Sequence, residues 1–359
     1  MCADAEETDD NGKPLPVETT QKYIVKEFHV PIFNPLIKKH GFTFGTIFNK
    51  SRQMIQEAIQ WADIVHSFMP FALEMYASHY AENSGKPNTG AFHIQPENLW
   101  SSVGLGKVEW IQNLSYRNFR DWHYYKFRHI HVPSEFMKRM LEERGYKAKI
   151  HVISNGIQDA FMAVGKNKID HGRPARRPEF QDKIVIMMVG RLSREKRQDV
   201  IINAVQYSKY ADKIQLVFAG KGPEYDHYVE LGKQLKHTPK YVYLGQEELI
   251  DLLLQCDLYV HASDMESEAI SCIEAFATGL VPIIANSEVS ATPQFALDGR
   301  SLFTPGDPRD LARAIDYWLE HPKEKQYMED IYRLSAKKYS LANSVSRFEE
   351  MLMEEIAEH

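Results

Sequence analysis

A regular alternation in the second half of the chain constrains the fold more than any other feature of the sequence. From residue 183 onward, short apolar runs alternate with longer segments of helical pattern. Buried parallel strands appear in sequences as short apolar runs, and parallel strands need crossover connections, usually helices, between them. The alternation therefore predicts a doubly wound parallel sheet with ligands at the carboxyl ends of its strands. The expected strands are KIVIMMVG, IQLVFAG, VYLG, DLYVHAS and VPIIA.

The first half shows the same alternation more sparsely. Residues 1–60 offer one extended stretch and one helix near 51–61, without the opening strand and glycine-rich turn that are usual in such domains. We therefore expect an α/β chain of two Rossmann-like doubly wound domains, the first incomplete at its N-terminus. A gene model that begins at an internal methionine would explain the missing start. The expected strands of this half are residues 63–68, 89–94, 129–134 and 149–154.

Length and composition divide the chain into segments. With 359 residues the chain is long enough for two domains. Its start is acidic and polar, and residues 157–182 are polar and contain prolines, as expected of a connection between domains. The expected segments are an acidic disordered start (1–20), a first domain (21–156), a linker (157–182), a second domain (183–340) and a C-terminal helix (341–359) that can pack back toward the first domain.

The composition also indicates in which compartment of the cell the protein is expected. The three cysteines form no C-x-x-C pair, which fits a reducing cytoplasm and argues against a cysteine-based zinc site. The start lacks an apolar signal segment, and the longest apolar runs are too short to cross a bilayer. Residues 19–160 carry a small excess of basic over acidic side chains, which permits contact with an anionic membrane surface. We expect a cytoplasmic protein, peripheral on the inner face of the cell membrane, without a nucleic-acid partner.

The segment GRLSREKRQD (190–199) follows the first strand of the second domain. Gly190 allows a close turn, and Arg191 and Lys196 place two cations at the carboxyl end of a strand beside a helix N-terminus. Such an arrangement suits a diphosphate. A solvated basic loop is the structural alternative.

A second glycine segment, AGKGPEY (219–225), follows the next strand. Gly220 and Gly222 permit a tight turn and a close approach of backbone. An ordinary turn is the alternative, because a G-x-G after a strand is weakly specific.

The third segment, residues 261–285, contains two acids. Glu266 precedes an expected helix, and Glu274 follows eight residues later, about 12 Å along a helix axis, which fits opposite ends of an elongated polar ligand. The helix N-terminus between them, at Ala269 and Ile270, favours phosphates. The alternative is an acid that stabilises the helix dipole plus an exposed glutamate. Three such segments at strand ends of one sheet favour a common ligand site.

Together these motifs resemble the family 4 glycosyltransferases of the GT-B fold. The resemblance rests on G-R-L-x-x-x-K, G-x-G-P, E-x7-E, A-x-G-x-x-P-I-I-A and P-G-D, and it covers residues 62–357. It implies a retaining transferase that uses a nucleotide-sugar, UDP-linked, with no cofactor or metal. Arg191 and Lys196 would hold the diphosphate of the donor, Glu274 its ribose and Glu266 the transferred sugar. The other donor-site residues would be Gly190, Gly220, Gly222, Ala269 and Ile270.

The resemblance extends to the first domain, but the sequence departs from the family pattern after the first glutamate. The family has a histidine in its catalytic cleft after a strand, and His93 in AFHIQPEN matches it, with a satisfied structural histidine as the alternative. After the first glutamate the family commonly has G-F-G, where this chain has Ser267, Glu268 and Ala269. Glu268 would add negative charge near the expected phosphates. No D-x-D motif stands at a strand end, which agrees with the expectation of no metal.

The acceptor is the least determined part of the prediction. Residues 29–42, 91–98 and 286–303 are similar to the bacterial diacylglycerol glucosyltransferases, which implies a membrane-lipid acceptor. An expected helix near 108–128 mixes aromatic and basic residues, as helices at a bilayer interface do, although packing against the sheet is an alternative. Two other hypotheses stay open: a soluble or polyprenyl-linked saccharide acceptor, and an inactive nucleotide-sugar-binding fragment. The membrane or acceptor candidates are Trp110, Arg117, Arg120, Trp122, Lys126 and Arg128.

Overall fold

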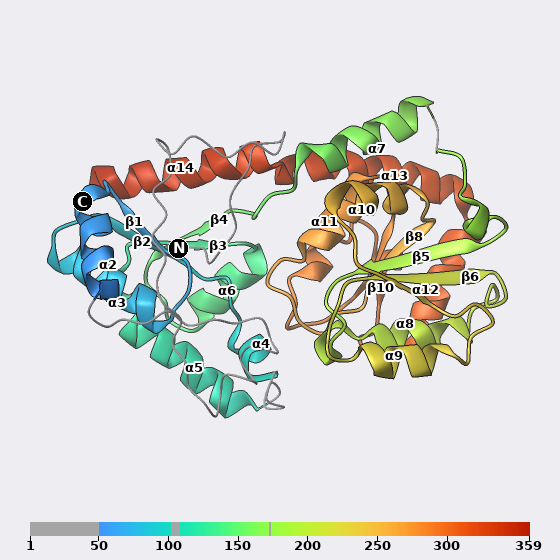
Figure 1. Cartoon of the computed structure of the whole chain (residues 1–359), viewed down its shortest axis with the longest axis horizontal. Coiled ribbons are helices and arrows are strands. Elements are labelled where there is room, and N and C mark those ends of the chain that lie inside the picture. The colour runs from blue at the N-terminus through green and yellow to red at the C-terminus, as the bar shows by residue number, and fades with distance from the viewer. Residues whose placement is uncertain (1–49, 102–107, 172–173) are drawn as a thin grey trace.

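The computed structural model describes residues 50–101, 108–171 and 174–359. These residues form two α/β units that lie side by side (Figure 1). The extended stretch expected within residues 1–49 and the lipid-transferase similarity in residues 29–42 lie outside the described residues.

The first unit is built on a parallel sheet in the order β1-β2-β3-β4, and each strand overlaps one that the sequence predicts. Its core is aromatic, with Phe92, Tyr116 and Tyr124 packed between the sheet and the helices. The strands are β1 (Val65–Ser67), β2 (Asn88–Ala91), β3 (His129–Val132) and β4 (Lys149–Val152). The helices are α2 (Lys50–Trp61), α3 (Ala72–Asn83), α4 (Pro96–Ser101), α5 (Glu109–Trp122) and α6 (Glu135–Glu143), with a 3-10 turn at Tyr124–Lys126.

The second unit holds a parallel sheet in the order β10-β9-β8-β5-β6-β7. All of its expected strands are present, and the short edge strand β10 is an addition that the sequence pattern did not show. The strands are β5 (Ile184–Val189), β6 (Ile214–Ala219), β7 (Lys240–Val242), β8 (Leu258–His261), β9 (Pro282–Ala285) and β10 (Leu302–Phe303). The helices are α8 (Gln198–Val205), α9 (Tyr225–Gly232), α10 (Gln246–Leu254), α11 (Ile270–Ala277), α12 (Pro308–Glu320) and α13 (Pro322–Ala336).

The strand order of the second sheet fixes where a ligand can bind. From β5 the chain proceeds to β6 and β7 on one side, and then to β8, β9 and β10 on the other side. The carboxyl ends of β5 and β8 are therefore the topological switch point of the sheet, which is the usual ligand position in open α/β sheets. The segment GRLSREK follows β5, and HASDMES begins with His261, the last residue of β8, and continues into the loop after it.

The segment expected to be a linker is helical in part. Helix α7 (Asp159–His171) and a 3-10 turn at Pro178–Phe180 lie within it. Ile157, Phe161 and Phe180 are buried in the core of the second unit. Much of residues 157–182 therefore packs on the second unit instead of forming a polar loop.

The C-terminal helix α14 (Leu341–Glu358) leaves the second unit and lies along the first, as the red helix in Figure 1 shows. Its Phe348 ring stands 4.8 Å from the ring of His66 and 5.7 Å from that of His131, measured between centroids. His131 is buried in β3, while His66 is a partly buried residue of β1. Helix α14 thus covers a face of the first sheet that carries histidines.

Candidate functional site

An ion pair joins the loops after β5 and β8 at the switch point of the second sheet. Lys196 Nζ donates to Glu266 Oε1 at 2.5 Å, and His261 Nε2 lies 2.9 Å from the same oxygen. Both hydrogen bonds go to Oε1, so within the described residues Glu266 Oε2 has no hydrogen-bond partner. One carboxylate oxygen is therefore held by the protein, and the other is available to a ligand hydroxyl.

The environment of Glu266 keeps it ionised. Burial by itself would raise the pKa of this carboxyl, but the Lys196 ammonium and the hydrogen bond from His261 hold it well below its usual range. Because a carboxylate only accepts hydrogen bonds, His261 Nε2 carries the proton of that bond. His261 Nδ1 then accepts from Tyr259 Oη at 3.3 Å. This chain of contacts fixes the orientation of the carboxylate.

The second predicted cation of the β5 loop is also paired with an acid. Arg191 lies 2.9 Å from Glu195, and its side chain is partly exposed. Arg197 adopts the left-handed conformation, with φ of 55°, and contacts both Asp199 and Asp264 at distances of 3.1 and 3.2 Å. The Asp264 amide also donates to the carbonyl of Glu195 at 2.8 Å, so the β8 loop contacts the residue on each side of Lys196.

The glycines of the β6 loop allow this loop to lie directly on the β5 loop. A Cβ atom on Gly220 would stand 2.1 Å from the carbonyl oxygen of Gly190, and one on Gly222 would stand 2.1 Å from that of Leu192. The backbone of the β6 loop therefore approaches the backbone of its neighbour, and this packing accounts for both glycines without a ligand.

Helix α11 follows the β8 loop and has an unusual residue at its N-cap. Ala269 precedes the helix with φ of 74°, a left-handed conformation that costs about 1–2 kcal/mol for a residue with a Cβ. The Cys272 amide donates to the Ala269 carbonyl at 3.0 Å, while the amides of Ile270 and Ser271 before it have no intrahelical acceptor and carry the positive end of the helix dipole. Because Glu266 lies before the helix, the separation of about 12 Å that a continuous helix implied for Glu266 and Glu274 does not apply.

Glu274 lies within α11 and is only partly buried. None of the described residues donates a hydrogen bond to its carboxylate. Burial therefore raises the pKa of Glu274, with no opposing contact. Donors supplied by a ligand, such as a pair of sugar hydroxyls, would compensate this carboxylate.

Glu268 does not lie where the sequence led us to expect it. Its carboxylate accepts hydrogen bonds from the backbone amide of Asn155 at 3.1 Å and from the side chains of Ser154 and Asn155 in the loop after β4. The Glu268 carboxylate therefore links the second unit to the loop after β4 of the first unit. Burial raises the pKa of Glu268, although these hydrogen bonds oppose the rise.

Two further contacts bring the strand ends of the first unit against the β8 and β9 loops. Ser134 Oγ, after β3, donates to the carbonyl of Ser267 at 2.7 Å. Gln95 Nε2, after β2, donates to the carbonyl of Val289 at 3.2 Å, and the neighbouring Ala291 amide donates to the carbonyl of Glu266 at 2.8 Å. The carboxyl ends of both sheets therefore meet at one place.

His93 stands at this meeting place, two residues before Gln95. Its ring stacks on Phe68 with centroids 4.4 Å apart, and its Nε2 lies 3.4 Å from Nδ1 of His131. His131 Nε2 donates to the carbonyl of Ile153 at 2.7 Å, so its Nδ1 accepts from His93 when both rings are neutral. Burial, together with the neighbouring His131, lowers the pKa of His93 to about 3, so the ring is neutral near pH 7.

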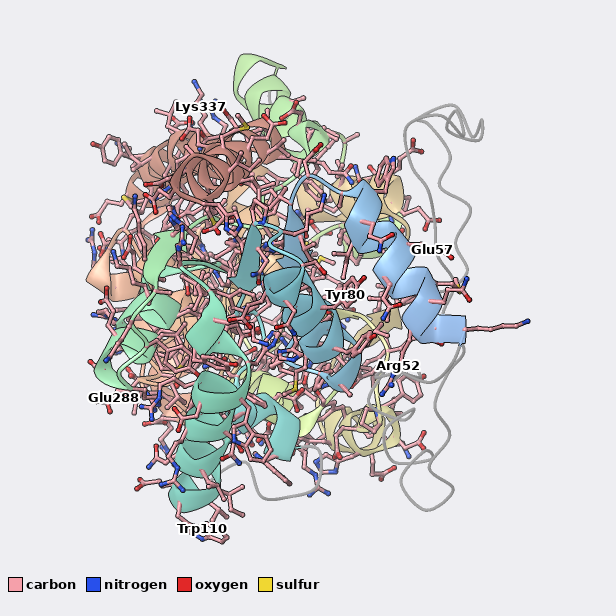
Figure 2. All side chains as sticks on the ribbon, turned by 90° about the vertical axis from the view of Figure 1, so that its left-hand side faces the viewer. Arg52, Glu57, Tyr80, Trp110, Glu288 and Lys337 are labelled. Atoms are coloured by element: carbon pink, nitrogen blue, oxygen red, sulfur yellow. The ribbon has the colours of Figure 1, made fainter. Side chains whose placement is uncertain are left out.

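The aromatic and basic helix divides into α5 and the turn after it. Trp110 and Trp122 are 68% and 67% exposed, and Figure 2 shows Trp110 at the end of α5, projecting from the protein. The opposite face of α5 packs on the core through Tyr116. Arg120 contacts Asp121 and Arg128 contacts the backbone of Glu358, so these two cations engage the protein itself. Arg117 is exposed, and Lys126 lies over the ring of Tyr125.

Several residues at this place were not among the predicted ones. The carboxylate of Glu266 is oriented by His261 and, through it, by Tyr259. Arg191 is oriented by Glu195, and His93 is oriented by His131. The alternating histidines of HIHV, at 129 and 131, could have indicated a polar sheet face, because residues two apart in a strand lie on the same side.

No helix in the described part of the chain is long and apolar enough to span a bilayer. Residues 173–334 match the family model described as glycosyl transferases group 1, and residues 8–161 match the model of glycosyltransferase family 4. Together the two matches take in most of the chain.

Individual proteins with similar sequences or folds include a curated relative and two solved structures. The alpha-monoglucosyldiacylglycerol synthase of Streptococcus pneumoniae is 25% identical over 232 residues, which are 62% of this chain and 52% of that protein. The chain thus spans about half the length of this relative. Anabaena Alr3699/HepE in complex with UDP-glucose has 17% identity and a TM-score of 0.68, and the match covers 91% of this chain and 90% of that one. The catalytic domain of the Helicobacter pylori cholesterol-alpha-glucosyltransferase is 47% identical, covering 44% of this chain and 99% of that one, with a TM-score of 0.43.

Proposed function

Because this chain belongs to the family 4 glycosyltransferases, we propose that it transfers a hexose from a UDP-linked nucleotide-sugar to the hydroxyl of a membrane lipid, with retention of anomeric configuration. The observation that carries the proposal is the cluster of Lys196, Glu266 and the N-terminus of α11 at the switch point of the second sheet. This cluster offers an ammonium group, free helix amides and a carboxylate oxygen to one ligand.

The donor is bound by groups of complementary chemistry. An ammonium has three N–H donors, and Lys196 uses one on Glu266, so two remain for phosphate oxygens without breaking the ion pair. Arg191 and the first amides of α11 add further donors to the diphosphate. Glu266 Oε2 accepts from a hydroxyl of the transferred hexose, and Glu274 accepts from the ribose hydroxyls.

The acceptor enters from the first unit. His93 presents a neutral ring at the meeting edge of the two sheets and assists in placing the reacting hydroxyl. The lipid assignment is supported by the name of the Streptococcus pneumoniae relative, an alpha-monoglucosyldiacylglycerol synthase. It is also supported by the exposed Trp110 and Trp122 with Arg117 on the outer side of α5, a combination that suits a headgroup region.

A screen of donors and acceptors tests the proposed function. The full chain is incubated with UDP- and GDP-linked hexoses, and nucleotide release is followed with vesicles that contain diacylglycerol, ceramide or a sterol, or with soluble saccharides. We expect release that depends on a lipid hydroxyl. Silence with every donor would contradict the catalytic proposal, while turnover of soluble saccharides alone would contradict the lipid acceptor.

Membrane contact is measured separately by sedimentation with anionic vesicles. The double variant Trp110→Ala, Trp122→Ala is expected to bind at least about tenfold more weakly, because interfacial aromatic side chains supply part of the binding free energy. Trp61→Ala is the matched control, since Trp61 is 73% exposed but lies on α2. Equal losses in both variants would contradict a specific role for α5.

Glu274→Gln is expected to raise the KM for the donor by roughly 10- to 100-fold and to change the KM for the acceptor little. The glutamine keeps the size of the side chain but replaces charge-assisted hydrogen bonds to the ribose, each worth about 1.5–3 kcal/mol, by neutral ones. Initial rates over a matrix of donor and acceptor concentrations separate the two constants. An unchanged donor KM would remove Glu274 from the donor site.

A further inference from the structure

We propose that His129, His151 and Glu354 form a binding site for a first-row divalent cation, of which Zn²⁺ fits best, between helix α14 and the first sheet. His129 comes from β3, His151 from the paired strand β4 and Glu354 from α14. The site is separate from the proposed sugar-transfer site, because His129 is the first residue of β3 and the transfer site lies beyond the carboxyl ends of the strands.

The three donor atoms face one another. His129 Nδ1 lies 2.8 Å from His151 Nε2, and Glu354 Oε2 lies 3.9 Å from each of these nitrogens. A tetrahedral zinc ion bound at about 2.0–2.1 Å separates its ligand atoms by roughly 3.3 Å. An ion therefore fits between the three atoms if the two nitrogens part slightly and the carboxylate oxygen moves closer.

Two further atoms of these side chains, Glu354 Oε1 and His129 Nε2, have partners that leave the donor atoms free to bind an ion. Glu354 Oε1 pairs with Lys149, which leaves Oε2 to face the histidines. His129 Nε2 lies 3.1 Å from Glu358 Oε2, so this nitrogen carries a proton and donates it. A metal-bound histidine commonly donates its other N–H to a carboxylate, which directs the lone pair of the first nitrogen to the metal.

A buried carboxylate beside the cluster gives an independent indication of a missing positive charge. Glu355 is only 3% exposed, and its Oε2 has no hydrogen-bond partner among the described residues. This oxygen lies 3.7 Å from His129 Nε2. The other oxygen of Glu355, Oε1, lies 3.9 Å from His359 Nδ1. A buried carboxylate oxygen without a hydrogen bond is costly, and a cation on the opposite side of the His129 ring would strengthen the attraction of Oε2 to that N–H.

The ligand set indicates the class of ion. Two imidazole nitrogens and one carboxylate oxygen suit Zn²⁺ and its first-row neighbours, whereas Mg²⁺ and Ca²⁺ prefer oxygen ligands. His129 is 1% exposed, but the side chains of His151 and Glu354 are 17% and 32% exposed, which leaves a route from solvent. A bound ion would crosslink α14 to β3 and β4.

Metal binding to the full chain tests this inference without any measurement of sugar transfer. The chelated and dialysed protein is titrated with Zn²⁺ and, separately, with Mg²⁺ by calorimetry, and Co²⁺ serves as a spectroscopic probe. We expect one Zn²⁺ per chain, a Co²⁺ spectrum of low coordination number, a melting temperature that rises with Zn²⁺ until saturation, and no such response to Mg²⁺.

Variants distinguish the site from adventitious binding. His151→Ala and Glu354→Gln are expected to weaken Zn²⁺ binding by at least about 100-fold, since each removes one of three ligands. His79→Ala, an exposed histidine on α3, is the matched control and should bind like the parent chain. Lys149→Ala should keep the affinity, because Lys149 pairs with Oε1 of Glu354 and the proposed ligand atom is Oε2, while a purely structural ion pair would show only a loss of stability. Absence of saturable binding, or equal binding by His151→Ala, would overturn the inference.

Discussion

Replacement of Lys196 by methionine is expected to lower kcat/KM for the nucleotide-sugar by roughly 10²- to 10³-fold, the usual cost of removing one group that stabilises developing charge. In the proposed function the departing diphosphate gains charge as the bond to the hexose breaks, and the Lys196 ammonium stands at the switch point to meet it. Methionine keeps an unbranched side chain that is one atom shorter, and it removes the charge together with the N–H donors. Steady-state kinetics with saturating acceptor measure the change.

The same substitution has a second effect that must be separated from the first. The Glu266 side chain is 12% exposed, and without Lys196 its carboxylate keeps only His261 as a partner among the described residues. Removal of one partner from a buried ion pair typically costs about 3–5 kcal/mol of stability. The double variant Lys196→Met, Glu266→Gln removes the unpaired charge, so it should melt closer to the parent while remaining inactive.

Lys209→Met is the matched control for the catalytic effect. Lys209 also forms an ion pair, with Glu320, but its side chain is 67% exposed and its partner lies on α12. We expect unchanged kinetics. Activity of Lys196→Met within a factor of three of the parent would remove the ammonium from the transfer step.

Gly222→Ala is expected to destabilise the second unit by more than about 2 kcal/mol and to reduce transfer in parallel, because overpacking of backbone against backbone cannot be relieved by a rotamer change. The added Cβ would stand 2.1 Å from the Leu192 carbonyl oxygen and 2.6 Å from its amide nitrogen. The β6 loop would have to leave the β5 loop, which carries Arg191 and Lys196. Thermal or urea unfolding measures the loss of stability.

Gly299→Ala is the matched control for this prediction. Its Cβ would meet nothing within 4 Å, and its backbone does not adopt a positive φ. We expect a change of stability within about 0.5 kcal/mol, as for most surface substitutions. Equal stability of the two variants would show that the loops do not pack as closely as the structure has them.

Most of the second sheet could be predicted from the sequence because each buried strand is a short apolar run between helices. The run IVIMMV leaves no polar residue on either face, and β5 lies at the centre of the sheet with neighbours on both sides. The edge strand β10 has only two residues, Leu302 and Phe303, and so short a strand has no pattern of its own.

The charged residues of the candidate site could be named from the sequence, but the contacts that their side chains make could not. The motifs gave Lys196, Glu266 and Glu274, because charged residues after strands stand out in sequence. The direction of a side chain is not encoded in spacing, and Glu268 was expected near phosphates while its carboxylate turns to Ser154 and Asn155. That contact depends on how the two units meet, which is a property of the whole fold.

The histidine and glutamate cluster lay beyond the reach of motif analysis for a related reason. His129 and His151 are on different strands, and Glu354 is on the last helix. Metal motifs are recognised by short spacings within a loop or helix, and no such spacing links these residues. Only the return of α14 to the first sheet brings them together.

The return of α14 also affects how the chain is made. The first unit is discontinuous in sequence, since its sheet is finished by β4 but the helix that covers His66 and His131 is synthesised only after the whole second unit. A ribosome builds the chain from its N-terminus, and domains generally fold as they emerge. The face of the first sheet that carries His66 and His131 therefore stays uncovered until α14 has been synthesised. The second unit is expected to reach its final packing before the first.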